Sequence, residues 1–298
     1  MSTLVILHQG AIGDFLLTLP VIQAARDTLQ ADSVTAIATA PSARLAAGRS
    51  VVDVWLSPEE LGLYRLFCAD LPLSERLART LAGADYVLSF LSGRREGIHR
   101  RLAASVSGQL VSIDPRPTPL TREQRRHISA QWTADIRAAG WPIPDPVPAR
   151  IHMPARRKWP PQRVLIHPGS GGKAKCWPLD RFIALAETLR GVDVTWMLGP
   201  AELHQARVLQ DRDEPLLVEE DLSQAGQQMA GFDLYVGNDS GMTHLAAALG
   251  LPVVAVFGTT DPHIWRPLGD HVTVVAPADL DDPIESVTLD QVRTAIAI

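Results

Sequence analysis

The sequence predicts an α/β protein with two domains of similar size. Its 298 residues suit two ordinary domains better than one. In both halves of the chain, short apolar runs typical of strands alternate with segments of helical pattern, as in parallel-sheet proteins. Residues 140–161 are rich in proline, which stiffens a connection and interrupts helices and central strands. We therefore predict two Rossmann-like domains, residues 1–150 and 151–298, that face a cleft.

The first half begins with a strand, a glycine-bearing turn and a helix. Residues 4–7 are wholly apolar, as expected of a central parallel strand, and a helix is expected over 14–29 with a kink or irregular turn at Pro20. The turn between them reads G-x-x-G-D, which differs from the G-x-G-x-x-G of dinucleotide-binding proteins. Further strands are expected at 34–38, 51–55, 86–89 and 110–113, and further helices at 73–81, 92–104 and 121–139.

The second half repeats this order of elements. A strand at 164–166 precedes a loop of small residues, and a helix is expected from Pro178, since proline is favoured in a first helical turn, to residue 189. Thr288 and Gln291 have the spacing of a capping box, which predicts a final helix. The remaining strands are expected at 192–197, 216–218, 234–236, 253–257 and 272–275, and the remaining helices at 201–210, 222–231 and 242–249.

The turn at residues 237–241 lies between a predicted strand and a predicted helix, the place where parallel sheets bind ligands. The helix N-terminus would present unpaired N–H groups and a partial positive charge, which suit a phosphate group. Asp239 and His244 flank this position. The alternative is that Asp239 or Ser240 is only an N-cap and that His244 is an ordinary, partly buried histidine.

A second loop, residues 167–175, also suits an anion. It joins small residues with open backbone N–H groups to Lys173 and Lys175. It is not a Walker A loop, because position 167 is histidine and Ala174 replaces the required serine or threonine. The chain has no His/Cys/Asp/Glu cluster with metal-ligand spacing and no G-x-S-x-G motif, so neither a metal site nor a serine hydrolase is predicted.

Composition excludes several classes of protein. A hydrophobic fraction of 46% and a mean hydropathy of +0.05 allow a sizeable core, and a net charge of -5 disfavours nucleic-acid binding. The two cysteines, Cys68 and Cys176, make no disulfide framework, and the N-terminus lacks the pattern of a signal peptide. No apolar run reaches the roughly 18 residues of a transmembrane helix. We expect a cytoplasmic protein, with peripheral contact with the inner membrane surface left open.

Several motifs, taken together, carry a family resemblance. They are Gly10-x-x-Gly13-Asp14, His167-Pro168-Gly169-Ser170, Lys175-x-Trp177-Pro178, and Asn238-Asp239-Ser240-Gly241-x-x-His244 followed by Leu245-Ala246-Ala247-Ala248. In this order and spacing they resemble glycosyltransferase family 9, the lipopolysaccharide heptosyltransferases and their relatives. The resemblance extends through nearly the whole chain.

The resemblance implies a GT-B fold, in which two Rossmann-like domains face a central cleft. Residues 1–150 would form the acceptor-side domain and residues 151–298 the domain that binds the nucleotide-sugar donor. It also implies an inverting glycosyltransferase that needs no metal or other cofactor. Such an enzyme would move a sugar, heptose from ADP-heptose, onto a lipopolysaccharide core or a similar anionic glycan or glycolipid.

The resemblance also implies roles for particular residues. Asp14 would be the general base toward the acceptor hydroxyl, and a carboxylate at a helix N-terminus is held ionised for that task. The alternative is that Asp14 only caps its helix. Lys175 would meet the donor phosphates, or else be a solvated loop lysine, and Trp177 is expected to pack in the core. The other implied donor-binding residues are Ser170, Gly171, Glu202, Asp239, Ser240, Gly241 and His244.

The acceptor side has no motif that matches the family. A basic segment of the first half could hold an anionic acceptor, because arginine forks match phosphate and carboxylate groups. Its arginines could equally form a solvated face. The candidates are Arg94, Arg95, Arg100 and Arg101, and a second basic group consists of Arg122, Arg125 and Arg126.

Two other classes of protein remain open at this point. A nucleotide-sugar epimerase also uses two such domains, although its acid and base residues do not follow the pattern of Asp14 and His244. A non-catalytic nucleotide-sugar binding protein would not need a base such as Asp14 together with Lys175.

Overall fold

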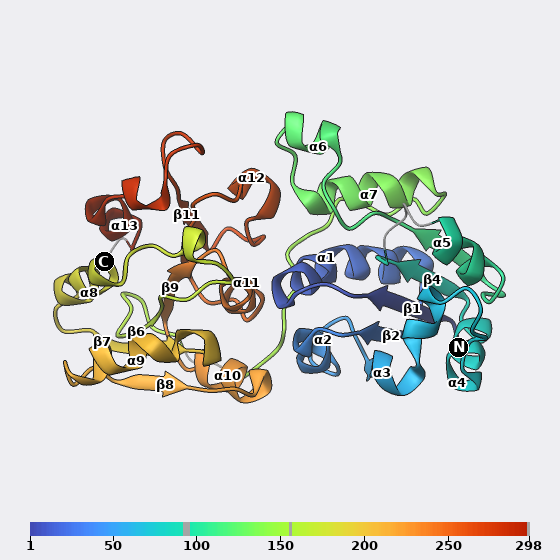
Figure 1. Cartoon of the computed structure of the whole chain (residues 1–298), viewed down its shortest axis with the longest axis horizontal. Helices are drawn as coiled ribbons and strands as arrows, with labels where there is room; N and C mark the ends of the chain where they lie inside the picture. The colour runs from blue at the N-terminus through green and yellow to red at the C-terminus, as the bar shows by residue number, and fades with distance from the viewer. Residues whose placement is uncertain (92–95, 155–156, 297–298) are drawn as a thin grey trace. The chain divides into compact units, whose positions relative to one another are not determined.

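A computed structural model of the chain describes residues 1–91, 96–154 and 157–296 (Figure 1). Its internal contacts divide the chain into two compact units, Met1–Ala149 and Arg150–Ile298. The division falls in the proline-rich segment. Each unit contains one parallel sheet, as the alternation of strands and helices predicts.

The sheet of the first unit has five strands in the order β3-β2-β1-β4-β5, and every neighbouring pair is parallel. The central strand β1 pairs on one side with β2, Leu4 opposite Val34, and on the other with β4, Leu4 opposite Tyr86. The connections therefore change direction between β1 and β4. The strands are β1 (Thr3–His8), β2 (Ser33–Ala38), β3 (Val54–Leu56), β4 (Tyr86–Ser89) and β5 (Gln109–Ser112).

Apolar side chains cover both faces of this sheet. Val5 and Leu7 of β1 pack in a buried cluster with residues of α3, η1, α4 and α5, whereas Leu4 and Ile6, on the opposite face, are also fully buried. The helices are α1 (Ile12–Leu29), α2 (Pro41–Ala46), α3 (Pro58–Leu61), the 3₁₀ helix η1 (Leu63–Phe67), α4 (Glu75–Ala82), α5 (Glu96–Ala103), α6 (Pro119–Glu123) and α7 (Ile128–Ala138).

The prediction of one helix over residues 121–139 was wrong. The segment forms two helices, because Arg125 has a φ of 47° and so leaves the helical conformation. Thr118 caps α6 and His127 caps α7 with their side chains. The short helices α2 and α3 were not predicted; each begins at a proline but is too short to show a helical period.

The sheet of the second unit has six strands in the order β11-β10-β9-β6-β7-β8, all parallel. From β6 the chain proceeds outward to β7 and β8, and then returns to β9 on the other side of β6. The strand order thus reverses between β6 and β9. The strands are β6 (Arg163–His167), β7 (Asp193–Leu198), β8 (Leu216–Val218), β9 (Leu234–Asn238), β10 (Val253–Val256) and β11 (Val272–Val275).

A large buried cluster joins one face of this sheet to α8 and α13. Trp177 belongs to it, 1% exposed, which confirms its expected packing role. Thr288 and Gln291 form the predicted capping box, since each backbone N–H donates to the other side chain. The helices are η2 (Lys173–Lys175), α8 (Leu179–Thr188), η3 (Pro200–Glu202), α9 (Leu203–Gln210), α10 (Leu222–Met229), α11 (Gly241–Ala248), α12 (Pro262–Trp265), η4 (Ile284–Ser286) and α13 (Leu289–Ile296).

Candidate functional site

The main candidate site lies where the strand order of the second unit reverses. Because β6 and β9 are parallel neighbours, their carboxyl ends, His167 and Asn238, lie at the same edge of the sheet. The buried side chain of Asn238 connects the loops there: its Nδ2 donates to the Pro168 carbonyl at 2.7 Å, and its Oδ1 accepts from the Trp177 N–H at 2.9 Å. A single buried amide therefore holds both ends of the 168–177 loop against β9.

An ion pair lies beside this amide. Lys175 Nζ is 2.9 Å from Asp239 Oδ2, and the side chain of Asp239 is only 7% exposed, whereas that of Lys175 is 38% exposed. The Ser170 hydroxyl donates to the Asp239 main-chain carbonyl at 2.6 Å. Three of the predicted donor-site residues are thus in direct contact, and the ammonium group is accessible to a ligand.

The N-terminus of α11 borders the ion pair. Ser240 is its N-cap, and the Ser240 hydroxyl accepts from the Thr243 N–H at 3.4 Å, which confirms the capping role considered for Ser240. Thr243 Oγ1 in turn donates to the Asn238 carbonyl. Gly241 is the first residue of the helix, and His244 is 7% exposed, one turn along. The cap satisfies one of the N–H groups that lack a partner within the helix, and a phosphate role for this end stays a prediction.

Glu202 reaches the same edge from η3, the 3₁₀ helix that follows β7. Its carboxylate accepts from the Gly199 N–H at 3.0 Å, and only 8% of the residue is exposed. A Cβ added to Gly169 would lie 2.3 Å from Glu202 Cδ, so the absence of a side chain at Gly169 allows the carboxyl group to lie against the loop. Glu202, one of the implied donor-binding residues, therefore lies beside the loop that carries Ser170.

His167, which ends β6, was quoted in a motif but was given no role of its own. It is buried, and its Nδ1 donates to the Met197 carbonyl at 2.9 Å, which links the ends of β6 and β7. Burial lowers the pKa of His167, and the nearby Glu202 carboxylate opposes that shift. His167 is thus a neutral structural contact beneath the loop. The rule that strand carboxyl ends meet at one edge could have identified it.

Asp14 lies in the first unit, in the first turn of α1. Its Oδ2 accepts from the Ala11 N–H at 3.1 Å, so the carboxylate caps the turn as the alternative interpretation expects. The side chain is partly exposed. A carboxylate oxygen has more than one lone pair, so the cap leaves Asp14 able to accept a proton from a ligand.

The arginines proposed for the acceptor differ in their surroundings. Arg94 and Arg95 lie outside the described residues. Arg100 pairs with Glu96 at 2.8 Å on the exposed surface of α5. The guanidinium group of Arg101 donates to the carbonyls of Ala69, Arg65 and Leu71 at 2.7, 3.1 and 2.5 Å, so it holds the chain segment that follows η1. These contacts favour structural roles for Arg100 and Arg101, and their acceptor role stays a prediction.

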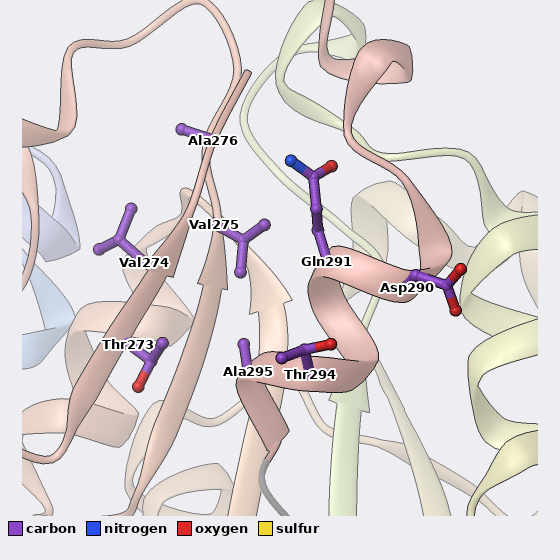
Figure 2. Close-up of a pocket in the computed structure, with 8 residues that line it drawn as sticks. All are labelled: Thr273, Val274, Val275, Ala276, Asp290, Gln291, Thr294 and Ala295. Carbon is purple, nitrogen blue, oxygen red and sulfur yellow. The ribbon is translucent and has the colours of Figure 1, made fainter. Parts of the chain in front are cut away.

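A separate pocket of about 540 Å³ lies between β11 and α13 (Figure 2). Its lining residues are Thr273, Val274, Val275, Ala276, Asp290, Gln291, Thr294 and Ala295, which include none of the predicted site residues. In the part of the chain that the structure describes, no three His, Cys, Asp or Glu residues gather as a metal site. Over the same residues, no helix combines the length and apolar character needed to cross a membrane.

Sequence comparisons find that the second unit is similar to a known family. The model of glycosyltransferase family 9 (heptosyltransferase) matches residues 149–288. Lipooligosaccharide heptosyltransferase 2 of Haemophilus influenzae is 34% identical over 115 residues, which are 35% of this chain and 33% of that protein. Lipopolysaccharide heptosyltransferase 3 of Escherichia coli is 30% identical over 118 residues, 37% of this chain and 35% of that protein. The matched region thus spans about a third of each curated relative.

Structural comparisons extend over the whole chain. A family 9 glycosyltransferase of Veillonella parvula has a TM-score of 0.74 at 17% identity, with 99% of this chain and 96% of that chain covered. The E. coli heptosyltransferase WaaC, solved with ADP, has a TM-score of 0.70 at 17% identity, with 99% of each chain covered. At this identity the likeness establishes the fold, and it confirms the GT-B fold for this chain.

Proposed function

We propose that the chain is an inverting, metal-independent glycosyltransferase of family 9, whose model matches residues 149–288. Its donor would be a nucleotide-diphosphate sugar, ADP-heptose, and its acceptor a lipopolysaccharide core or a similar anionic glycan. The observation that carries the proposal is the contact between Lys175, Asp239 and Ser170 at the N-terminus of α11. This constellation lies inside the region that the family model matches.

The donor side follows from charge and position. A diphosphate carries negative charge, and Lys175 and the positive end of α11 would both stabilise it. When the sugar leaves the nucleotide, negative charge develops on the departing phosphate, so the same groups would favour the transition state. Ser170 and Gly171 would line the path of the phosphates, and Gly241 and His244 would contact them from α11. Asp239 would keep the Lys175 ammonium in place, and Glu202 would reach the nucleoside from the end of β7.

The acceptor side rests on Asp14. Transfer requires that the acceptor hydroxyl lose its proton as its oxygen attacks the anomeric carbon. In the proposed reaction the Asp14 carboxylate takes this proton, the new C–O bond forms on the face opposite the nucleotide, and the nucleoside diphosphate leaves with the bonding electrons. The anomeric configuration is thereby inverted. Peripheral contact with a membrane surface would fit a glycolipid acceptor.

The test is to incubate the protein with ADP-heptose alone and with heptose-deficient lipopolysaccharide cores, and to follow both substrates by mass spectrometry. Release of ADP that depends on the acceptor, together with a gain in mass on the glycan, is expected. A sugar altered while still attached to ADP, without acceptor, would indicate an epimerase instead. ADP binding without either reaction would indicate a non-catalytic binding protein. A ligand at 100 times its dissociation constant adds about 2.7 kcal/mol to stability, so thermal unfolding can also rank the nucleotide bases.

A further inference from the structure

A buried histidine ends the central strand of the first unit. His8 is the last residue of β1 and only 2% exposed. Its ring packs edge-on against Phe15 of α1 and Phe90 after β4, with centroids 5.4 and 5.9 Å apart. His8 therefore lies where the strand order of the first unit reverses, between β1 and β4, the kind of position at which such sheets bind ligands.

The imidazole of His8 contacts the turn that leads to Asp14. The Gly10 N–H donates to His8 Nδ1 at 3.2 Å. A Cβ at Gly10 would lie 2.6 Å from His8 Cε1 and 3.0 Å from both His8 Nε2 and Asp14 Cβ. The ring, the glycine and the base of the Asp14 side chain thus meet around one point. Any side chain at position 10 would push them apart.

These contacts define the protonation state of the ring. Because Nδ1 accepts a hydrogen bond, the neutral ring carries its proton on Nε2. Burial lowers the pKa of His8 to about 4, so the ring is neutral near neutral pH. A neutral ring can accept from Gly10, whereas an imidazolium could not.

We propose that His8 is a positioning residue for Asp14, and that its Nδ1 holds the 9–13 turn in the geometry that orients the Asp14 carboxylate toward the acceptor hydroxyl. The proposal rests on the proposed function, in which Asp14 is the base. Two hydrogen bonds connect His8 to Asp14. The Gly10 N–H donates to His8 Nδ1, and the N–H of the next residue, Ala11, donates to Asp14 Oδ2. Loss of the first contact allows the turn to move, and small misplacement of a base lowers turnover strongly.

Two variants separate the hydrogen bond from the packing. His8→Phe keeps an aromatic ring against Phe15 and Phe90 but has no acceptor. His8→Asn keeps an acceptor near the position of Nδ1 and loses the ring. We expect His8→Phe to lower kcat by at least roughly tenfold with the donor KM within about twofold of wild type, and His8→Asn to recover a large part of kcat.

Combination with Asp14→Asn distinguishes positioning from a general structural role. If His8 acts through Asp14, His8→Phe should cause no further loss of kcat in the Asp14→Asn background. The same fold loss in both backgrounds, or wild-type kcat in His8→Phe, would overturn the proposal. A wild-type protein without any transfer would overturn the proposed function itself, which is a different result.

A spectroscopic measurement tests the contact without activity. In ¹⁵N NMR spectra of the full chain at pH 7, His8 should appear as the neutral ring protonated at Nε2, and the signal of the Gly10 N–H should shift in His8→Phe and return toward wild type in His8→Asn. A ring protonated at Nδ1, or an imidazolium, would overturn the proposal. This measurement can still overturn the proposal if His8→Phe folds poorly, because the spectrum of the wild-type protein alone shows which ring nitrogen is protonated.

Discussion

Lys175 and Asp239 are 64 positions apart in the sequence, and their side chains form an ion pair of 2.9 Å at the end of β9. The pair is asymmetric: the side chain of Asp239 is almost buried, whereas that of Lys175 is more than a third exposed. Asp239 thus depends on Lys175 for its charge partner, while Lys175 can also reach a ligand. The first prediction follows from this difference.

Lys175→Ala is expected to weaken ADP binding by roughly tenfold or more and to lower stability at the same time, because Asp239 then remains buried without its cation. Adding Asp239→Asn should restore much of the stability but not the ADP affinity. Calorimetry with ADP and AMP, together with thermal unfolding, measures both effects. Lys158→Ala, which removes an exposed lysine outside the 167–175 loop, is the matched control. Wild-type ADP affinity in Lys175→Ala would show that the donor site has been misplaced.

Asp14→Asn is expected to lower transfer by at least roughly 100-fold, as the loss of a general base typically does, and to leave ADP affinity nearly unchanged. The amide keeps an oxygen that can accept from the Ala11 N–H, so α1 should remain capped. Asp27→Asn, on the same helix and exposed, controls for the loss of one charge. Turnover and ADP affinity should be measured on one preparation; normal turnover in Asp14→Asn would remove Asp14 from the mechanism.

Gly169→Ala should weaken nucleotide binding by roughly tenfold, because the new Cβ would displace the Glu202 carboxyl group. If Glu202 contacts the nucleoside, Glu202→Ala should weaken binding by itself, and the double variant should bind no worse than Glu202→Ala. Gly172→Ala is the control, since its Cβ would meet nothing within 4 Å. Equal ADP affinity of Gly169→Ala and Gly172→Ala would argue against a role for Glu202 in binding.

Stability should fall in acid because of His8. Its pKa is lowered from 6.5 to about 4 by burial, so between these values the unfolded chain binds a proton that the folded chain does not. Above about pH 6.5 the neutral His8 costs no stability. As the pH falls from 6.5 toward 4, the free energy of unfolding decreases by roughly 3 kcal/mol, at 1.36 kcal/mol per pKa unit.

Denaturant unfolding of wild type and His8→Asn as a function of pH measures this effect. The stability of wild type should fall more steeply than that of His8→Asn between pH 6.5 and 4. Between pH 7 and 8.5 the difference between the two proteins should be constant, which serves as the internal control. If the free energies of unfolding of the two proteins change in parallel over the whole pH range, the pKa of His8 is not lowered by folding.

Transfer is expected to persist in EDTA, because Lys175 and the N-terminus of α11 supply positive charge to the diphosphate. The measurement is the initial rate before and after chelation and dialysis. A rate that disappears with EDTA and returns with magnesium or manganese would contradict the metal-independent mechanism.

Much of the fold can be predicted from the sequence. Apolar runs such as residues 4–7 and 164–166 are buried central strands because only a strand covered on both faces is apolar throughout. The capping box at Thr288 was predicted from two residues, since a cap depends on local spacing alone. The break at Arg125 was missed because the helical pattern continues on both sides of it. The motifs also led to the GT-B fold, which the structural comparisons confirm.

The contacts of the candidate site were decided by the tertiary structure. No single segment of the sequence determines the order of the strands in the sheet. The placement of β6 between β7 and β9 brings Glu202, Lys175 and Asp239 to one sheet edge. Likewise, a histidine at the end of β1 has no distinguishing local pattern, and its contact with Gly10 depends on how the turn folds back over the ring. Local spacing determines caps and strands, because those interactions join near neighbours. Ion pairs and buried rings join distant residues, so their partners are set by packing.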